Sequence, residues 1–151
     1  MFESIVTSRV LYGAASWTLT KTLEAKLIVA RRRMLRMMFP TARPASESFV
    51  DYVQRKTHII EDRLSKLAVD NWAQQAHSRK WRFIAKLVRI EDDRWTKRLI
   101  GWRPLLPRGR NVGHPRLRWE DRFVSIAGGA WWDAANDPEL WGLLESAINV
   151  L

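Results

Sequence analysis

Residues 72–90 read WAQQAHSRKWRFIAKLVRI, and this stretch decides the fold class. Apolar side chains recur here at the spacing i, i+3, i+4 and i+7, namely Trp81, Ile84, Ala85 and Val88. Basic side chains occupy much of the remaining surface: Arg79, Lys80, Arg82, Lys86 and Arg89. An apolar stripe of this period, with charges elsewhere, is typical of an amphipathic α-helix. Asp70 or Asn71 is its expected N-cap.

Two long segments before it carry the same helical signal. Thr20 is the expected N-cap of a helix that ends at Phe39, because the residue before a proline avoids helical backbone. Its predicted inward face is Leu23, Leu27, Ala30, Met34 and Met38. Another helix is predicted at about 47–68, with Phe49, Val53, Ile59 or Ile60, Leu64 and Leu67 directed inward.

Shorter helices are predicted at 95–102 and 116–127, the latter broken by Gly128 and Gly129. Asp137 is the expected cap of a last helix that begins with Pro138. Its predicted apolar face is Leu140, Trp141, Leu144, Ala147 and Ile148. Between these helices, residues 103–116 are predicted to form a Pro/Gly-rich loop. No run alternates with period two, so we expect an all-α fold of several amphipathic helices and no sheet.

Charge is high and unevenly placed along the chain. The 151 residues have a formal net charge of +10. Residues 79–122 hold fourteen Lys and Arg against five acidic side chains, whereas residues 123–151 hold four acidic side chains and no Lys or Arg. A basic block of this kind is typical of a protein that binds a polyanion. We therefore expect RNA or DNA as the partner, held through phosphate contacts, with the acidic last helix bounding the site.

Several chemistries are excluded by composition. The chain has no Cys, which excludes disulfides, zinc knuckles and thiol catalysis. Its three His are too scattered for a metal site. Asp92-Asp93 is the sole adjacent Asp pair and follows a predicted helix, not the strand that a polymerase site requires. We expect no enzyme activity, no metal, no cofactor and no small-molecule substrate.

The chain also lacks a recognisable signal peptide or an apolar run of about 20 residues. We therefore expect a soluble protein, nuclear or cytoplasmic, without a membrane partner.

Five blocks resemble the region downstream of the reverse transcriptase domain in non-LTR (LINE-type) retrotransposons. LYGAASWTLTK at 11–21 is similar to the family's LYG-(S/A)-E-T-W-T-L-T-K, with Ala15 and Ser16 as departures. RRRMLRMMF at 31–39 is similar to its R-R-M-L-R helix. RKWRFIAKLVRIEDDRW at 79–95 resembles R-(L/K)-R-W-x-G-H-V-x-R-M, with Ala85-Lys86 in place of Gly-His.

The other two blocks lie in the last third of the chain. GRNVGHPRLRWEDRF at 109–123 is similar to G-R-P-(R/K)-x-R-W-x-D-D, with His114 and Arg122 as departures. The stretch 131–145, which ends in DPELWGLLE, resembles a tail block of some of these elements. The blocks occur in order over most of the chain.

This resemblance implies a fragment of an endonuclease/reverse transcriptase polyprotein whose enzymes lie upstream. Residues 1–44 would be a remnant of the polymerase thumb and connection helices. Residues 45–102 would be a helical region with the basic helix, residues 103–116 a Pro/Gly/Arg loop, and residues 117–151 a C-terminal helical tail.

The candidate nucleic-acid-binding residues are Arg79, Lys80, Arg82, Lys86, Arg89, Arg108, Arg110, His114, Arg116 and Arg118. The alternatives are an ordinary solvated helix face for the first five and a solubilising linker for the rest. We expect Trp81, Trp119, Trp131 and Trp141 in the core and leave Trp95 and Trp102 open to base stacking. Two other interpretations of the whole chain stand beside binding: a relic with no selected activity, or a basic helical protein that binds an anionic partner surface.

Overall fold

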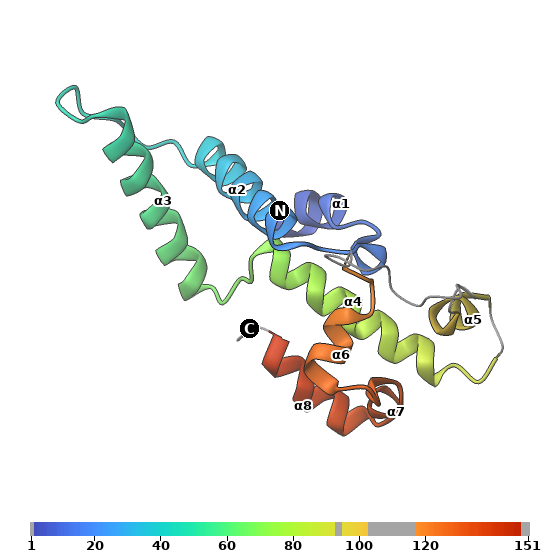
Figure 1. Cartoon of the computed structure of the whole chain (residues 1–151). Helices are drawn as coiled ribbons and strands as arrows, with labels where there is room; N and C mark the ends of the chain where they lie inside the picture. The colour runs from blue at the N-terminus through green and yellow to red at the C-terminus, as the bar shows by residue number, and fades with distance from the viewer. Residues whose placement is uncertain (1, 93–94, 103–116, 149–151) are drawn as a thin grey trace. The chain divides into compact units, whose positions relative to one another are not determined.

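The computed structural model describes residues 2–92, 95–102 and 117–148, and this part of the chain is helical (Figure 1). It contains no β-strand, so the prediction of an all-α fold is confirmed for the described residues. The longer helices are α2 (Lys21–Met38), α3 (Phe49–Lys66), α4 (Trp72–Arg89) and α8 (Pro138–Ile148). The shorter ones are α1 (Ser8–Val10), α5 (Trp95–Gly101), α6 (Asp121–Ala127) and α7 (Trp131–Asn136). A π-helix at Phe2–Thr7 precedes α1, and a 3-10 helix at Ala14–Ser16 follows it. The predicted loop at 103–116 lies outside the described residues.

The chain forms two compact units. The first consists of Met1–Val10 and Leu19–Gln75, and the second of Leu11–Thr18 and Ala76–Leu151. The first turn of α4 therefore belongs to the first unit and the rest of that helix to the second.

In the first unit, α2 begins as predicted, but the face through which it packs is only partly the predicted one. The Thr20 Oγ1 accepts a hydrogen bond from the Leu23 backbone N at 3.3 Å. The buried side chains of α2 are Arg31 and Leu35, whereas Leu23 and Met38 are exposed. Of the predicted inward residues, Leu27 and Met34 are partly buried, but Leu23, Ala30 and Met38 are exposed, because the pattern assigned Arg31 to the surface. Arg31 is buried because its guanidinium pairs with the carboxylate of Glu3, with Nη2 and Oε1 at 3.2 Å.

Helix α3 is capped by Ser48, whose Oγ accepts a hydrogen bond from the Asp51 backbone N at 3.1 Å. Ile60 is buried as predicted. Phe49 and Leu67 are 65% and 70% exposed, so their predicted inward placement was wrong. Both lie at the ends of the helix, beyond the stretch over which α2 and α3 exchange side-chain contacts such as Arg36 Nη1 to Thr57 Oγ1 at 3.1 Å.

The core of the second unit is aromatic. The rings of Trp81 and Trp141 stack with centroids 3.8 Å apart and an interplanar angle of 11°. Each indole Nε1 donates to the backbone O of the other tryptophan, at 3.0 and 3.1 Å. Phe123 lies 5.6 Å from Trp81 and 5.3 Å from Trp131, ring to ring. The stripe predicted on α4 is confirmed, because all four of its members are buried: Trp81, Ile84, Ala85 and Val88.

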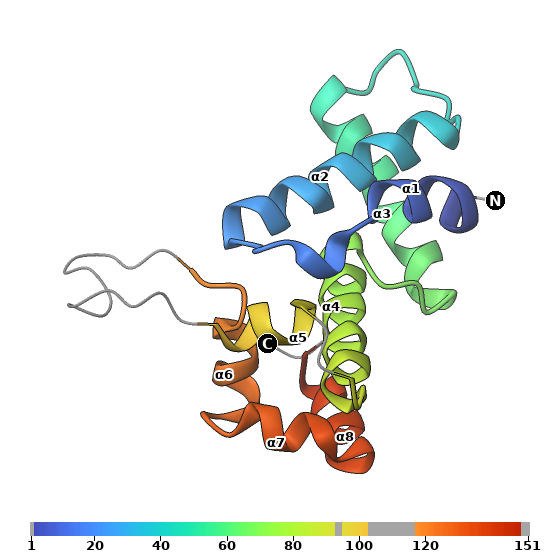
Figure 2. The same cartoon turned by 90° about the vertical axis from the view of Figure 1, so that its right-hand side faces the viewer.

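In the second unit, helices α6, α7 and α8 follow one another beside α4 (Figures 1 and 2). Gly128 ends α6 with a φ of 78°, which favours glycine, and so confirms the predicted break. The six-residue α7 was not predicted. Asp137 caps α8 as expected, since its Oδ1 accepts from the backbone N of Glu139 at 2.9 Å and of Leu140 at 3.2 Å. Trp141 is buried, but Leu140 is 43% exposed and does not belong to the apolar face. The side chains of Ala147 and Ile148 lie outside the described part.

Candidate nucleic-acid interface

Four basic side chains form a row along the exposed side of α4. Arg79, Arg82, Lys86 and Arg89 are all exposed, and they follow one another at i, i+3, i+7 and i+10. At 100° per residue these positions fall within an arc of about 80°. The helix presents this face to solvent because the opposite face carries the Trp81 stripe. We refer to these four residues as the basic row.

Three members of the basic row are held by the fold. The Arg79 Nη1 donates to the backbone O of Leu11 at 3.0 Å, and the Arg89 Nε donates to that of Ala135 at 2.9 Å. The Arg82 Nε contacts the Glu145 Oε1 at 2.8 Å. A guanidinium has five N–H donors, so each arginine keeps donors for an incoming phosphate.

Lys86 is the remaining member, and it makes no hydrogen bond or ion pair with the described residues. A phosphate can therefore contact this ammonium without displacing a partner among the described residues.

The last helix lies closer to the basic row than the sequence suggested. A groove of about 520 Å³ runs between α4 and α8, and Arg82, Lys86, Arg89 and Glu145 all line it. The expectation that the acidic tail merely bounds the site was wrong for Glu145, because the Trp81–Trp141 stack brings α8 against α4. The Arg82 side chain is 74% exposed, so the ion pair contributes at most about 1 kcal/mol and competes weakly with a phosphate.

Lys80 is not part of this surface. Its predicted place on the polar side was wrong, since the residue is only 6% exposed. The Lys80 Nζ donates to the backbone O of Trp17 at 3.2 Å and of Trp119 at 2.5 Å, and lies 4.5 Å from the centroid of the Trp119 ring. Burial, together with the nearby charge of Arg122, lowers the pKa of Lys80 to about 8. Lys80 thus joins three segments of the second unit and presents no charge to solvent.

The other candidate residues lie in or next to the segment 103–116, which was predicted as a loop. Arg118 is exposed, and its backbone N donates to the Asp121 Oδ2 at 2.7 Å. The remaining four, Arg108, Arg110, His114 and Arg116, lie outside the described residues.

The tryptophans divide as expected. Trp81, Trp131 and Trp141 are buried, and Trp119 packs against the same core while remaining partly accessible. Trp95 and Trp102 are 74% and 64% exposed. The pattern of the sequence did not single out Phe83, which is 38% exposed and lies on α4 one residue after Arg82 and three before Lys86. The sequence feature that could have identified Phe83 is an aromatic residue on the helix outside the apolar stripe.

A search for clustered metal ligands finds none in the part of the chain that the structure describes. Over residues 2–92, 95–102 and 117–148, no three His, Cys, Asp or Glu side chains are close enough to hold a metal ion. Within those same ranges, no helix combines the length and the apolar character needed to cross a bilayer.

Comparison with known proteins gives one informative match. No family model matches the chain, and no solved structure does. Over 123 residues, which are 80% of the chain, it is 27% identical to a Caenorhabditis elegans protein described as transposon-derived. The chain spans 40% of the length of that protein. This likeness supports a transposon-related origin for the chain.

Proposed function

We propose that the chain is a non-catalytic, nucleic-acid-binding helical module from the region downstream of the reverse transcriptase in a non-LTR retrotransposon polyprotein. The observation that carries the proposal is the basic row, four exposed cations on one face of a single helix. It spans about 15 Å at 1.5 Å per residue, enough to follow a stretch of phosphate backbone.

Packing in the second unit supports the origin in this family. The blocks that resemble the retrotransposon region at 11–21, 79–95 and 109–123 are far apart in the sequence but share hydrogen bonds. Lys80 joins Trp17 to Trp119, Arg79 donates to Leu11, and the Trp119 Nε1 donates to the Ala15 backbone O at 2.8 Å. The 131–145 block contributes the Trp141 ring to the same core. Signature residues that form one packed unit are expected when the motif records a structural module and not a chance run of Trp and Arg.

The proposed binding is electrostatic and independent of sequence. Each phosphate neutralised by an Arg or Lys releases condensed counterions, so affinity falls as salt rises. The logarithm of the association constant should fall with the logarithm of salt by about 0.7 per contact on a single strand and 0.9 on a duplex. Four contacts predict a slope of about −3 to −4 from the basic row.

The test is a salt titration of the purified chain with three probes: single-stranded RNA, duplex DNA, and vesicles that contain phosphatidylserine. The proposal predicts binding to nucleic acid with a linear log–log salt dependence and weaker binding to the vesicles. An absence of nucleic-acid binding at low salt, or a preference for the vesicles, would contradict it.

A further inference from the structure

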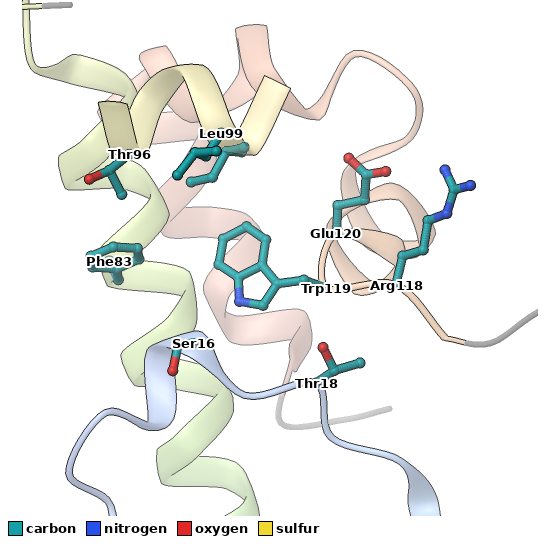
Figure 3. A pocket seen from close by; sticks show the side chains of 9 residues that line it. Ser16, Thr18, Phe83, Thr96, Leu99, Arg118, Trp119 and Glu120 are labelled. Atoms are coloured by element: carbon teal, nitrogen blue, oxygen red, sulfur yellow. The ribbon is translucent and has the colours of Figure 1, made fainter. Parts of the chain in front are cut away.

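Another cavity of the second unit has a volume of about 480 Å³ and includes Phe83 of α4 in its wall (Figure 3). Its apolar walls are Phe83 from α4, Leu99 and Ile100 from α5, and Trp119 from the turn before α6. The hydroxyls of Ser16 and Thr18 lie at one side of it, and the Arg118 side chain at another. The volume is in the range of pockets that bind small ligands. Apolar walls with a few polar groups are also typical of such pockets. We refer to it as the aromatic pocket.

The Trp119 wall is held in place before any ligand arrives. Its Nε1 donates to the Ala15 backbone O at 2.8 Å, and its ring meets the Phe123 ring edge-on at 5.1 Å. The Lys80 Nζ lies 4.5 Å from the ring centroid. A ring fixed by three contacts loses little conformational entropy when a ligand stacks against it.

The other walls leave apolar surface open to solvent. Phe83 is 38% exposed and Leu99 is 63% exposed. A flat apolar group that entered the pocket would cover both and would meet the Trp119 ring.

Cations outnumber acids around the aromatic pocket: Glu120 lines it, but so does Arg118, and two cations of α4 stand beside its Phe83 wall, which favours an anionic ligand. Phe83 stands four residues after Arg79 and three before Lys86, so all three side chains are neighbours on the same side of α4. Arg118, on the pocket wall, is also exposed. A ligand that joins a flat ring to a phosphate matches both features, and a nucleotide within a strand is such a ligand.

We infer that the aromatic pocket takes one unstacked base of single-stranded RNA or DNA while the basic row holds the neighbouring phosphates. The inference rests on the proposed function and adds a preference for single strands, because a base paired within a duplex cannot reach the pocket without being flipped out.

The experiment compares two strands of about 12 nucleotides that carry equal numbers of phosphates. One strand bears bases, and the other consists of abasic sites. Anisotropy titrations give the affinity of each strand for the parent chain, for Phe83→Ala and for Leu99→Gln. Phe49→Ala is the matched control, since Phe49 is exposed on α3 and belongs to neither the aromatic pocket nor the basic row. Circular dichroism checks that every variant retains the helical content of the parent.

The parent is expected to bind the base-bearing strand about tenfold more tightly than the abasic strand, as one stacked base would give. Phe83→Ala should lose most of this preference without changing the salt slope, and Phe49→Ala should keep it. If Phe83→Ala alters the fold, Leu99→Gln tests the pocket in its place, because the Leu99 side chain is more exposed than that of Phe83.

Equal binding of the two strands by the parent would overturn the inference and leave the proposed function standing. A full preference in both pocket variants would do the same, and would indicate that bases stack elsewhere. Failure of both strands to bind at low salt would overturn the proposed function and the inference together.

Discussion

Trp141→Ala should be the most damaging single substitution in the second unit. The residue is 3% exposed, its ring stacks on Trp81 at 3.8 Å, and its Nε1 donates to the Trp81 backbone O. Truncation of a buried Trp to Ala costs about 3–5 kcal/mol through lost burial and the cavity that remains. The Trp81 carbonyl also loses its indole donor, which accounts for about 1–3 kcal/mol of that range if no water replaces it.

The assay is urea unfolding followed by tryptophan fluorescence and circular dichroism, with Trp95→Ala as the control. Trp95 is 74% exposed, so the same substitution there should change the unfolding free energy by no more than about 0.5 kcal/mol. Trp141→Phe keeps a ring but removes the donor, and should fall between the two. If Trp141→Ala destabilised the chain no more than Trp95→Ala, the stacked pair would not be the centre of the core.

Three further predictions concern single charged groups. The lowered pKa of Lys80 means that the native state releases its proton more readily than the unfolded chain, whose Lys pKa is about 10.5. Its contribution to stability should be complete above pH 10.5 and be lost as pH falls through about 8. As pH rises from about 8 to 10.5, the unfolding free energy of the parent should therefore increase relative to that of Lys80→Met, and a constant difference would contradict this. Glu145→Gln should tighten binding to RNA at low salt by a small factor, because it releases Arg82, and should change stability by less than about 1 kcal/mol; weaker binding would argue against the groove. Asp137→Ala should lower the unfolding free energy by about 1 kcal/mol through loss of the α8 cap, measured by urea unfolding, whereas no change would mean that the cap is dispensable.

The helices that carry both period and caps were predictable from the sequence. α4 has an unbroken apolar stripe, and α8 has Asp137 and Pro138 at its start, so both were placed closely. α7 was missed because six residues after a Gly-Gly break are too few to show a period.

Buried charge was the main source of error. Periodicity assigns Arg and Lys to the surface, but Arg31 and Lys80 are buried beside partners that are distant in the sequence. Glu3 is 28 residues from Arg31, and the two carbonyls that accept from Lys80 are 63 and 39 residues away. No local pattern reports such a partner.

The candidate site was predictable only where it depends on local helical spacing. The exposed members of the basic row follow from helical spacing alone, since their side chains lie opposite the stripe. The position of Glu145 in the groove and the aromatic pocket around Phe83 depend on how α5 and α8 pack against α4. Those contacts are tertiary, and a single sequence does not contain them in readable form.

If the proposed function is right, the basic row of α4 binds nucleic-acid phosphates. The salt slope of RNA binding tests this phosphate contact in three proteins. They are the parent, the double variant Arg82→Ala with Lys86→Ala, and the double variant Lys21→Ala with Lys26→Ala. Both double variants remove two exposed positive charges, but Lys21 and Lys26 lie on α2, outside the row. The α4 pair should flatten the slope by about 1.4 on single-stranded RNA and weaken binding, while the α2 pair should leave the slope unchanged. Equal slopes for the two double variants would contradict phosphate binding by the basic row.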